Sequence, residues 1–95
     1  MDSIEKLLVE AAGKALADEF PGFKDNIEPD LNIFDLVDSF SVVNILLESE
    51  AAIEYKTGKY ISLASEKIFD AINSPFLKWS NWLAYVESLL RSEGM

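Results

Sequence analysis

Asp38 and Ser39 stand at the start of the most apolar helical pattern in the chain, where their types and order could support chemistry. A serine at the start of a helix places its hydroxyl near the positive end of the helix dipole and near free backbone amides. A phosphodiester formed on that hydroxyl would be stabilised by both. An Asp-Ser pair ahead of an apolar helix is also an ordinary capping signal. The dipeptide alone leaves both interpretations open: a cap, or an attachment site for a phosphate-linked group.

The chain lacks the residues that would make Ser39 a catalytic nucleophile. It contains no histidine and no cysteine, which excludes Ser–His and Cys–His pairs, disulfides and cysteine-based zinc sites. The acids do not have the regular spacing of a calcium loop. Nothing in the sequence places two carboxylates across a pocket, so a small acid–base enzyme is a weak alternative. We therefore expect that the protein is not an enzyme, and that any thiol chemistry would need a prosthetic group.

Two apolar stripes follow Ser39 along a helix that is predicted to reach Tyr55 or Lys56. One stripe contains Val42, Ile45, Leu46, Ser49 and Ile53, and the other contains Phe40, Val43, Leu47 and Ala51. A helix that only covers a core needs one such stripe. The second stripe is either enclosed by the small domain or exposed as a partner surface. The pattern alone does not decide between these two possibilities.

Acidic residues accompany the second stripe. Glu48, Glu50 and Glu54 lie on the same predicted helix, and Glu66 and Asp70 follow on the next element. An acidic rim around an apolar strip suits recognition of basic surfaces, although a solvated face is the simpler explanation for a run of charge. The chain has 17 acids and 8 bases, a formal net charge of -9, which disfavours nucleic acid and anionic lipid as partners.

The elements that position Ser39 follow from apolar spacing and helix breakers. The spacing predicts a helix over residues 3–19, a long loop over 20–38 pinned by isolated apolar side chains, and a short helix over 65–72. A last helix begins near Ser80, with Ser74-Pro75 as an earlier alternative start. We therefore predict an all-α fold of four helices, with a long first loop and a short third helix.

Length and composition favour one small domain over residues 1–95. Hydrophobic residues make up 49% of the sequence, which is enough for a core. A chain of 95 residues leaves little room for a deep active-site cleft. No apolar stretch approaches transmembrane length, and the first residues do not have the pattern of a signal peptide. We expect a cytoplasmic protein without membrane insertion.

The segment 36–40, Leu-Val-Asp-Ser-Phe, resembles the Asp-Ser-Leu segment of acyl carrier proteins, with Phe40 where that family usually has Leu or Met. The run from Ser80 to Val86 is similar to the start of the family's final helix, so the resemblance covers most of the chain. The family is a four-helix domain that carries 4'-phosphopantetheine on the serine that opens its second helix. The resemblance implies that Ser39 holds this group covalently and that Asp38 helps to position its transfer. It also implies a docking strip with an acidic rim, formed by Phe40, Val43, Leu47, Glu48, Glu50, Glu54 and Glu66.

The resemblance also implies the function and the partners. A phosphopantetheinyl transferase would load the arm, a ligase would attach an acyl or aminoacyl group as a thioester, and a downstream acyltransferase or synthase would receive it. Fatty acid or secondary metabolite biosynthesis would be the setting, and we expect a monomer. Val37 stands where many fatty-acid carriers have Gly, which makes the chain more similar to stand-alone acyl, aminoacyl or D-alanyl carriers. The alternative is a small helical interaction module without a prosthetic group, in which Ser39 is only a cap.

Overall fold

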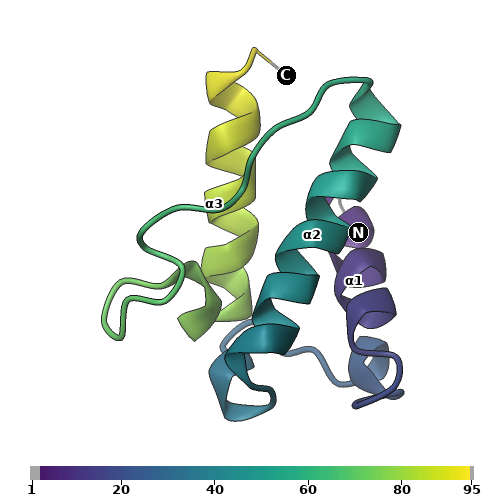
Figure 1. Cartoon of the computed structure of the whole chain (residues 1–95), viewed down its shortest axis with the longest axis vertical. Coiled ribbons are helices and arrows are strands. Elements are labelled where there is room, and N and C mark those ends of the chain that lie inside the picture. Colours follow the sequence, from purple (N-terminus) through teal and green to yellow (C-terminus); the bar gives the residue numbers. More distant parts are fainter. Residues whose placement is uncertain (1–2, 95) are drawn as a thin grey trace.

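The computed structural model describes residues 3–94, and these residues form three α-helices joined by long irregular segments (Figure 1). The helices are α1 (Ser3–Ala15), α2 (Ser39–Thr57) and α3 (Trp79–Ser92). Three single-turn 3-10 helices lie between them: η1 (Phe23–Asp25), η2 (Ile33–Asp35) and η3 (Pro75–Leu77). No strand occurs within residues 3–94, so the predicted all-α class is confirmed.

The three helices bury their apolar stripes in one shared core. α1 and α2 lie side by side with opposite chain directions, as the colours of Figure 1 show. Each helix contributes apolar residues spaced three or four positions apart, which places them on one face. The residues that the helices place in this core are Leu8, Ala12 and Leu16 from α1 and the turn after it, Val42, Ile45, Leu46 and Ile53 from α2, and Trp79, Trp82, Val86 and Leu90 from α3.

The long loop before α2 is fixed to the start of α3. Phe23 is buried and meets the Trp79 ring edge-on, with 6.0 Å between the ring centroids. No side chain caps α3, but the Trp79 amide donates to the Leu31 carbonyl and the Ser80 amide donates to the Pro29 carbonyl, both at 2.8 Å. The loop therefore caps α3, because its carbonyls accept from amides that the helix leaves free. These contacts fix the path of the loop that leads into α2.

The short third helix predicted over residues 65–72 does not form, and turns occupy this segment instead. Asp70 Oδ1 accepts hydrogen bonds from the amides of Ile72 at 2.8 Å and Asn73 at 2.9 Å. The Ser74 hydroxyl donates to the Ile68 carbonyl. These side chains offer the backbone partners other than those of a helix, and Pro75 cannot continue one. α1 is also shorter than the predicted 3–19, because turns replace the helix over 16–19.

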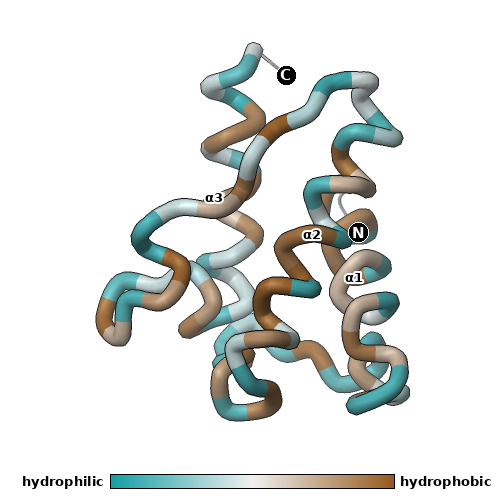
Figure 2. Tube along the Cα trace, in the orientation of Figure 1, coloured by the Kyte–Doolittle hydropathy of each residue, from teal (hydrophilic) through white to brown (hydrophobic). Residues whose placement is uncertain are grey.

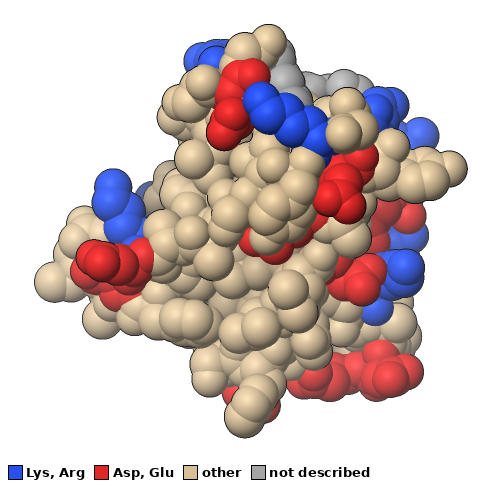
Figure 3. All heavy atoms as spheres, turned by 45° about the horizontal axis from the view of Figure 1, so that its top comes forward, with Lys and Arg blue, Asp and Glu red and all other residues tan. Residues whose placement is uncertain are grey.

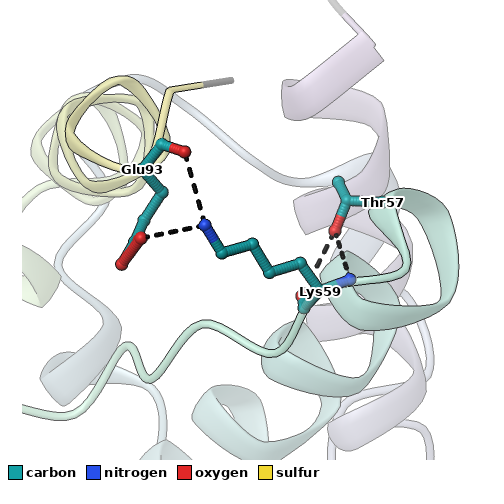
Figure 4. A network of polar contacts seen from close by, with 3 residues as sticks. All are labelled: Thr57, Lys59 and Glu93. Carbon is teal, nitrogen blue, oxygen red and sulfur yellow. Dashed lines mark hydrogen bonds and ion pairs between the residues drawn. The ribbon is translucent and has the colours of Figure 1, made fainter.

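The end of α2 is joined to the end of α3 by polar contacts (Figure 4). Gly58 has a φ of 75° and ends α2, and its amide donates to the Glu54 carbonyl. Lys59 Nζ lies 3.2 Å from Glu93 Oε2, while the Lys59 amide donates to Thr57 Oγ1 at 3.2 Å. The ion pair between Lys59 and Glu93 thus connects the segment after α2 to the residue that follows α3.

Candidate functional site

Ser39 is the first residue of α2, and its side chain is exposed. Asp38 precedes it as the N-cap, and Asp38 Oδ1 accepts a hydrogen bond from the Ser41 amide at 3.0 Å. The Val42 amide bonds to the Asp38 carbonyl at 3.2 Å and continues the helix. The amides of Ser39 and Phe40 precede the first intrahelical bond, so they point out of the helix end. Ser39 is thus an exposed residue at the positive end of α2, where the first amides of the helix point toward solvent.

Contacts behind the helix start hold this position in place. Ser41 is buried, and its hydroxyl donates to the Glu19 carboxylate in the turn after α1. Val37 is also buried, and its amide donates to the Ile33 carbonyl at 3.2 Å. Because both sides of the Asp38–Ser39 junction are anchored in this way, the serine is presented on a rigid element.

The second apolar stripe of α2 is exposed. Phe40, Val43 and Leu47 expose 81%, 39% and 57% of their surface, whereas the first stripe is buried. Figure 2 shows a largely hydrophobic stretch of α2 around its label, although one helix face suffices for the core. The exposure agrees with the expectation from the resemblance, and binding by this docking strip stays a prediction. The strip begins at the residue after Ser39 and continues along the same face of α2.

The four predicted rim acids do not lie together. Glu54 and Glu66 are exposed, and Glu54 follows Leu47 two turns further along the same face. Glu48 is half-buried at the α1 side, where its Oε2 lies 3.4 Å from Lys14 Nζ. Glu50 does not lie on the exposed rim, because the loop after α2 returns over it and buries it.

Glu50 is a structural carboxylate. Its Oε2 accepts from the Leu63 amide at 2.7 Å, and its Oε1 accepts from the Tyr60 hydroxyl at 3.0 Å. The Leu63 carbonyl accepts from the Tyr85 hydroxyl at 2.7 Å. The backbone amide and carbonyl of Leu63 are therefore both bonded to side chains, one from α2 and one from α3. The hydrogen bond to Glu50 and its negative charge raise the pKa of Tyr60 above its usual value.

Phe69 and Ile72 are exposed apolar residues that sequence reasoning did not include in the site. They expose 52% and 82% of their surface in the segment between α2 and η3. The Phe69 ring packs against Phe34 with 6.4 Å between centroids, and Phe34 lies in η2, just before Asp38. The signal available in the sequence was two large apolar residues, Phe69 and Ile72, in a segment that also contains many polar residues. The sequence predicts a helix over residues 65–72. A helix would place the side chains of Phe69 and Ile72 in other directions than the observed turns do.

No family model, curated protein or solved structure matches this chain. Among residues 3–94, no group of three or more histidine, cysteine or acidic side chains is arranged to hold a metal ion. The described helices include none that is long and apolar enough to cross a membrane. The chemical features that remain are the exposed hydroxyl of Ser39, its helix terminus and the apolar strip beside it.

Proposed function

We propose that the protein is a carrier that holds an acyl or aminoacyl group on a 4'-phosphopantetheine arm attached to Ser39. One observation carries the proposal: Ser39 is exposed and is the first residue of a helix that Asp38 caps. A phosphodiester at Ser39 Oγ would be stabilised there by the amides and the helix dipole. The resemblance of the segment 36–40 to acyl carrier proteins supports the same assignment.

The residues around Ser39 fit such a group. Ser39 and the neighbouring Phe40 are both exposed, so a transferase could approach this end of α2. When bound, the arm would supply a terminal thiol that carries the cargo as a thioester, and the chain has no cysteine that would compete for it. Tethering the cargo makes its delivery to a docked enzyme effectively intramolecular. In the chain order, the turns over 65–74 take the place of the family's third helix.

The docking strip would present this site to partner enzymes. Phe40, Val43 and Leu47 supply the apolar contact, and the exposed Glu54, two turns beyond Leu47 on the same face of α2, supplies negative charge. An apolar centre with charge near its rim gives contact area together with an electrostatic preference. The proposed partners are a phosphopantetheinyl transferase, a loading ligase and a downstream acyltransferase or synthase, each with a basic docking face.

The decisive experiment is loading with coenzyme A, Mg²⁺ and a promiscuous phosphopantetheinyl transferase, followed by intact mass measurement. The chain should gain one phosphopantetheine, and peptide mapping should place it on Ser39. Ser39→Ala should stay unmodified with an unchanged circular dichroism spectrum. Ser88→Ala, at an exposed serine of α3, is the matched control and should load normally. An unmodified wild-type chain, or modification at another residue, would contradict the proposal.

The exposure of Phe40 also supports a second candidate, a helical interaction module without a prosthetic group. In that case Ser39 is only the first residue of a capped helix, and the docking strip alone binds a partner. The loading experiment separates the two functions. A wild-type chain that stays unmodified under conditions that load a known carrier favours the module.

A further inference from the structure

A trough of about 1120 Å³ lies between α1 and α2, on a face of α2 that adjoins the docking strip and includes Glu48 and Ala51. Its lining contains four of the chain's 8 basic residues, although the chain as a whole has a net charge of -9. In Figure 3, blue and red side chains lie next to one another along the right-hand edge, the side on which Figure 1 shows α1 and α2. The basic residues that line the trough are Lys6, Lys14, Lys24 and Lys56.

Two of these lysines are neutralised within the trough. Lys24 Nζ lies 2.6 Å from Glu10 Oε2, and Lys14 Nζ lies 3.4 Å from Glu48 Oε2. Within residues 3–94, neither Lys6 nor Lys56 forms an ion pair, although the charge of Lys6 adds to the larger effect of Lys24 in lowering the pKa of Glu10. Because α1 and α2 run in opposite directions, the start of α1 and the end of α2 lie at the same end of the trough (Figure 1). The free positive charge is therefore concentrated at that end.

The floor of the trough consists mainly of small residues. They are Ala11, Gly13, Ala17, Ala51 and Ala52. The Lys24 side chain lies across Gly13, where an added Cβ would come within 2.7 Å of Lys24 Cε. Tyr55 stands at the edge with 94% of its surface exposed, so its ring has almost no protein contact. Small floor residues permit close approach of another backbone, and an exposed tyrosine can serve as an interface anchor.

The size and charge of the trough select the kind of occupant. Pockets that enclose a small ligand usually measure about 300–1,000 Å³ and surround most of it. This trough is larger and open to solvent along two helices. α1 has 13 residues, which corresponds to a length of about 20 Å, so a helix of similar length could lie along it. The unpaired lysines require that this helix carry negative charge.

We propose that the trough between α1 and α2 docks an acidic amphipathic helix of a partner protein. Its apolar side chains would lie on the alanine part of the floor and against Tyr55, because the Lys24 side chain covers Gly13. Its carboxylates would lie beside Lys6 and Lys56. The docking strip at Phe40 favours basic partners, so the two surfaces of α2 select partners of opposite charge. This inference does not depend on modification of Ser39.

A synthetic peptide tests the proposal on the full chain. It carries leucines at helical spacing flanked by glutamates, and a second peptide has lysines in place of the glutamates. Fluorescence anisotropy should show binding of the acidic peptide only. The double variant Lys6→Glu/Lys56→Glu should weaken it about tenfold or more. Lys67→Glu/Lys78→Glu makes the same charge change at exposed lysines outside the trough and should leave the affinity nearly unchanged.

Chemical-shift mapping by NMR identifies the face that binds. The acidic peptide should shift the amide signals of Ala52 and Tyr55 and leave those of Phe40 and Val43 in place. The proposal is overturned if neither peptide binds, if the basic peptide binds equally well, or if the shifts lie at the docking strip. Sedimentation that shows a dimer broken by the Lys6→Glu/Lys56→Glu change would also overturn it, since the occupant would then be a second copy.

Discussion

Asp38 has one role that is visible in its contacts and a second that the proposed function gives it. Its carboxylate caps α2 through the Ser41 amide, and the same charge stands next to the hydroxyl that a transferase would modify. The cap needs only an oxygen acceptor, whereas help with a transferase metal ion needs a negative charge. A substitution that keeps the oxygen and removes the charge therefore separates the roles.

Asp38→Ala should lower the free energy of unfolding by about 1 kcal/mol, the usual cost of losing an N-cap. Asp38→Asn should cost much less, because the amide oxygen still accepts from the Ser41 amide. If the charge assists the transfer, Asp38→Asn should nevertheless load more slowly than wild type. Urea unfolding and the time course of intact mass measure the two effects. Wild-type loading by Asp38→Asn would assign Asp38 to capping alone.

Tyr60 should show the contact with Glu50 through its titration. The folded pKa of Tyr60 is raised above its ordinary value, about 10, chiefly because its hydroxyl donates to the Glu50 carboxylate. The folded chain then holds this proton more tightly than the unfolded chain. The contribution to stability is complete below pH of about 10 and is lost as pH rises through the folded pKa.

Ultraviolet absorbance of the tyrosinates measures this titration directly. In the folded protein, Tyr60 should ionise at a pH above the ordinary range of a tyrosine. Tyr60→Phe should remove this late step, and Glu50→Gln should move it toward lower pH. A late step that persists in Tyr60→Phe would show that another tyrosine causes it.

At the scale of elements, Glu50 fixes the loop after α2 to the helix. Glu50→Ala leaves the buried Leu63 amide without its acceptor, so the free energy of unfolding should fall by about 1–3 kcal/mol. Glu50→Gln should cost less, because its oxygen can still accept from that amide. Glu54→Ala, at an exposed acid on the same helix, is the control and should change stability by less than about 0.5 kcal/mol. Equal effects at both positions in urea unfolding would contradict this role.

The elements that sequence reasoning placed correctly are those with a long apolar period. α2 and α3 have a buried stripe and a stop or start signal, and α1 has such a stripe over most of its predicted length. The segment 65–72 is too short for periodicity to outweigh local side-chain bonds, and Asp70 and Ser74 supply these. The cap at Asp38 and the stop at Gly58 could be predicted because both depend on neighbouring residues only.

The parts of the candidate site that depend on one helix could be predicted from the sequence. The parts that depend on how a later segment of the chain packs back over that helix could not. Ser39 and the docking strip follow from the pattern of α2. As an acid on α2, Glu50 is expected in the exposed rim. The chain from Tyr60 to Leu63 returns over it and accounts for its burial. The trough could not be foreseen either, since it combines Lys6 and Lys56 from opposite ends of two helices.

At the scale of the whole molecule, the negative charge should make stability depend on salt. The molecule measures 33 × 27 × 23 Å. At 10 mM salt the Debye length is about 30 Å, so nearly all of its charges repel or attract one another across the molecule. At 0.15 M it is about 8 Å, and distant interactions are screened. With a net charge of -9, repulsion dominates these distant interactions, so screening should stabilise the folded state.

The urea midpoint should therefore rise when NaCl is increased from about 10 mM to about 0.15 M, the range over which the Debye length shrinks below the size of the molecule. Loss of the exposed ion pairs, such as Lys59 with Glu93, opposes this rise only weakly, because such pairs contribute about 0–1 kcal/mol each. Asp18→Asn/Glu28→Gln removes two exposed acids outside the ion pairs and should reduce the salt effect. A midpoint that falls with salt would mean that local ion pairs outweigh the repulsion summed over the whole chain.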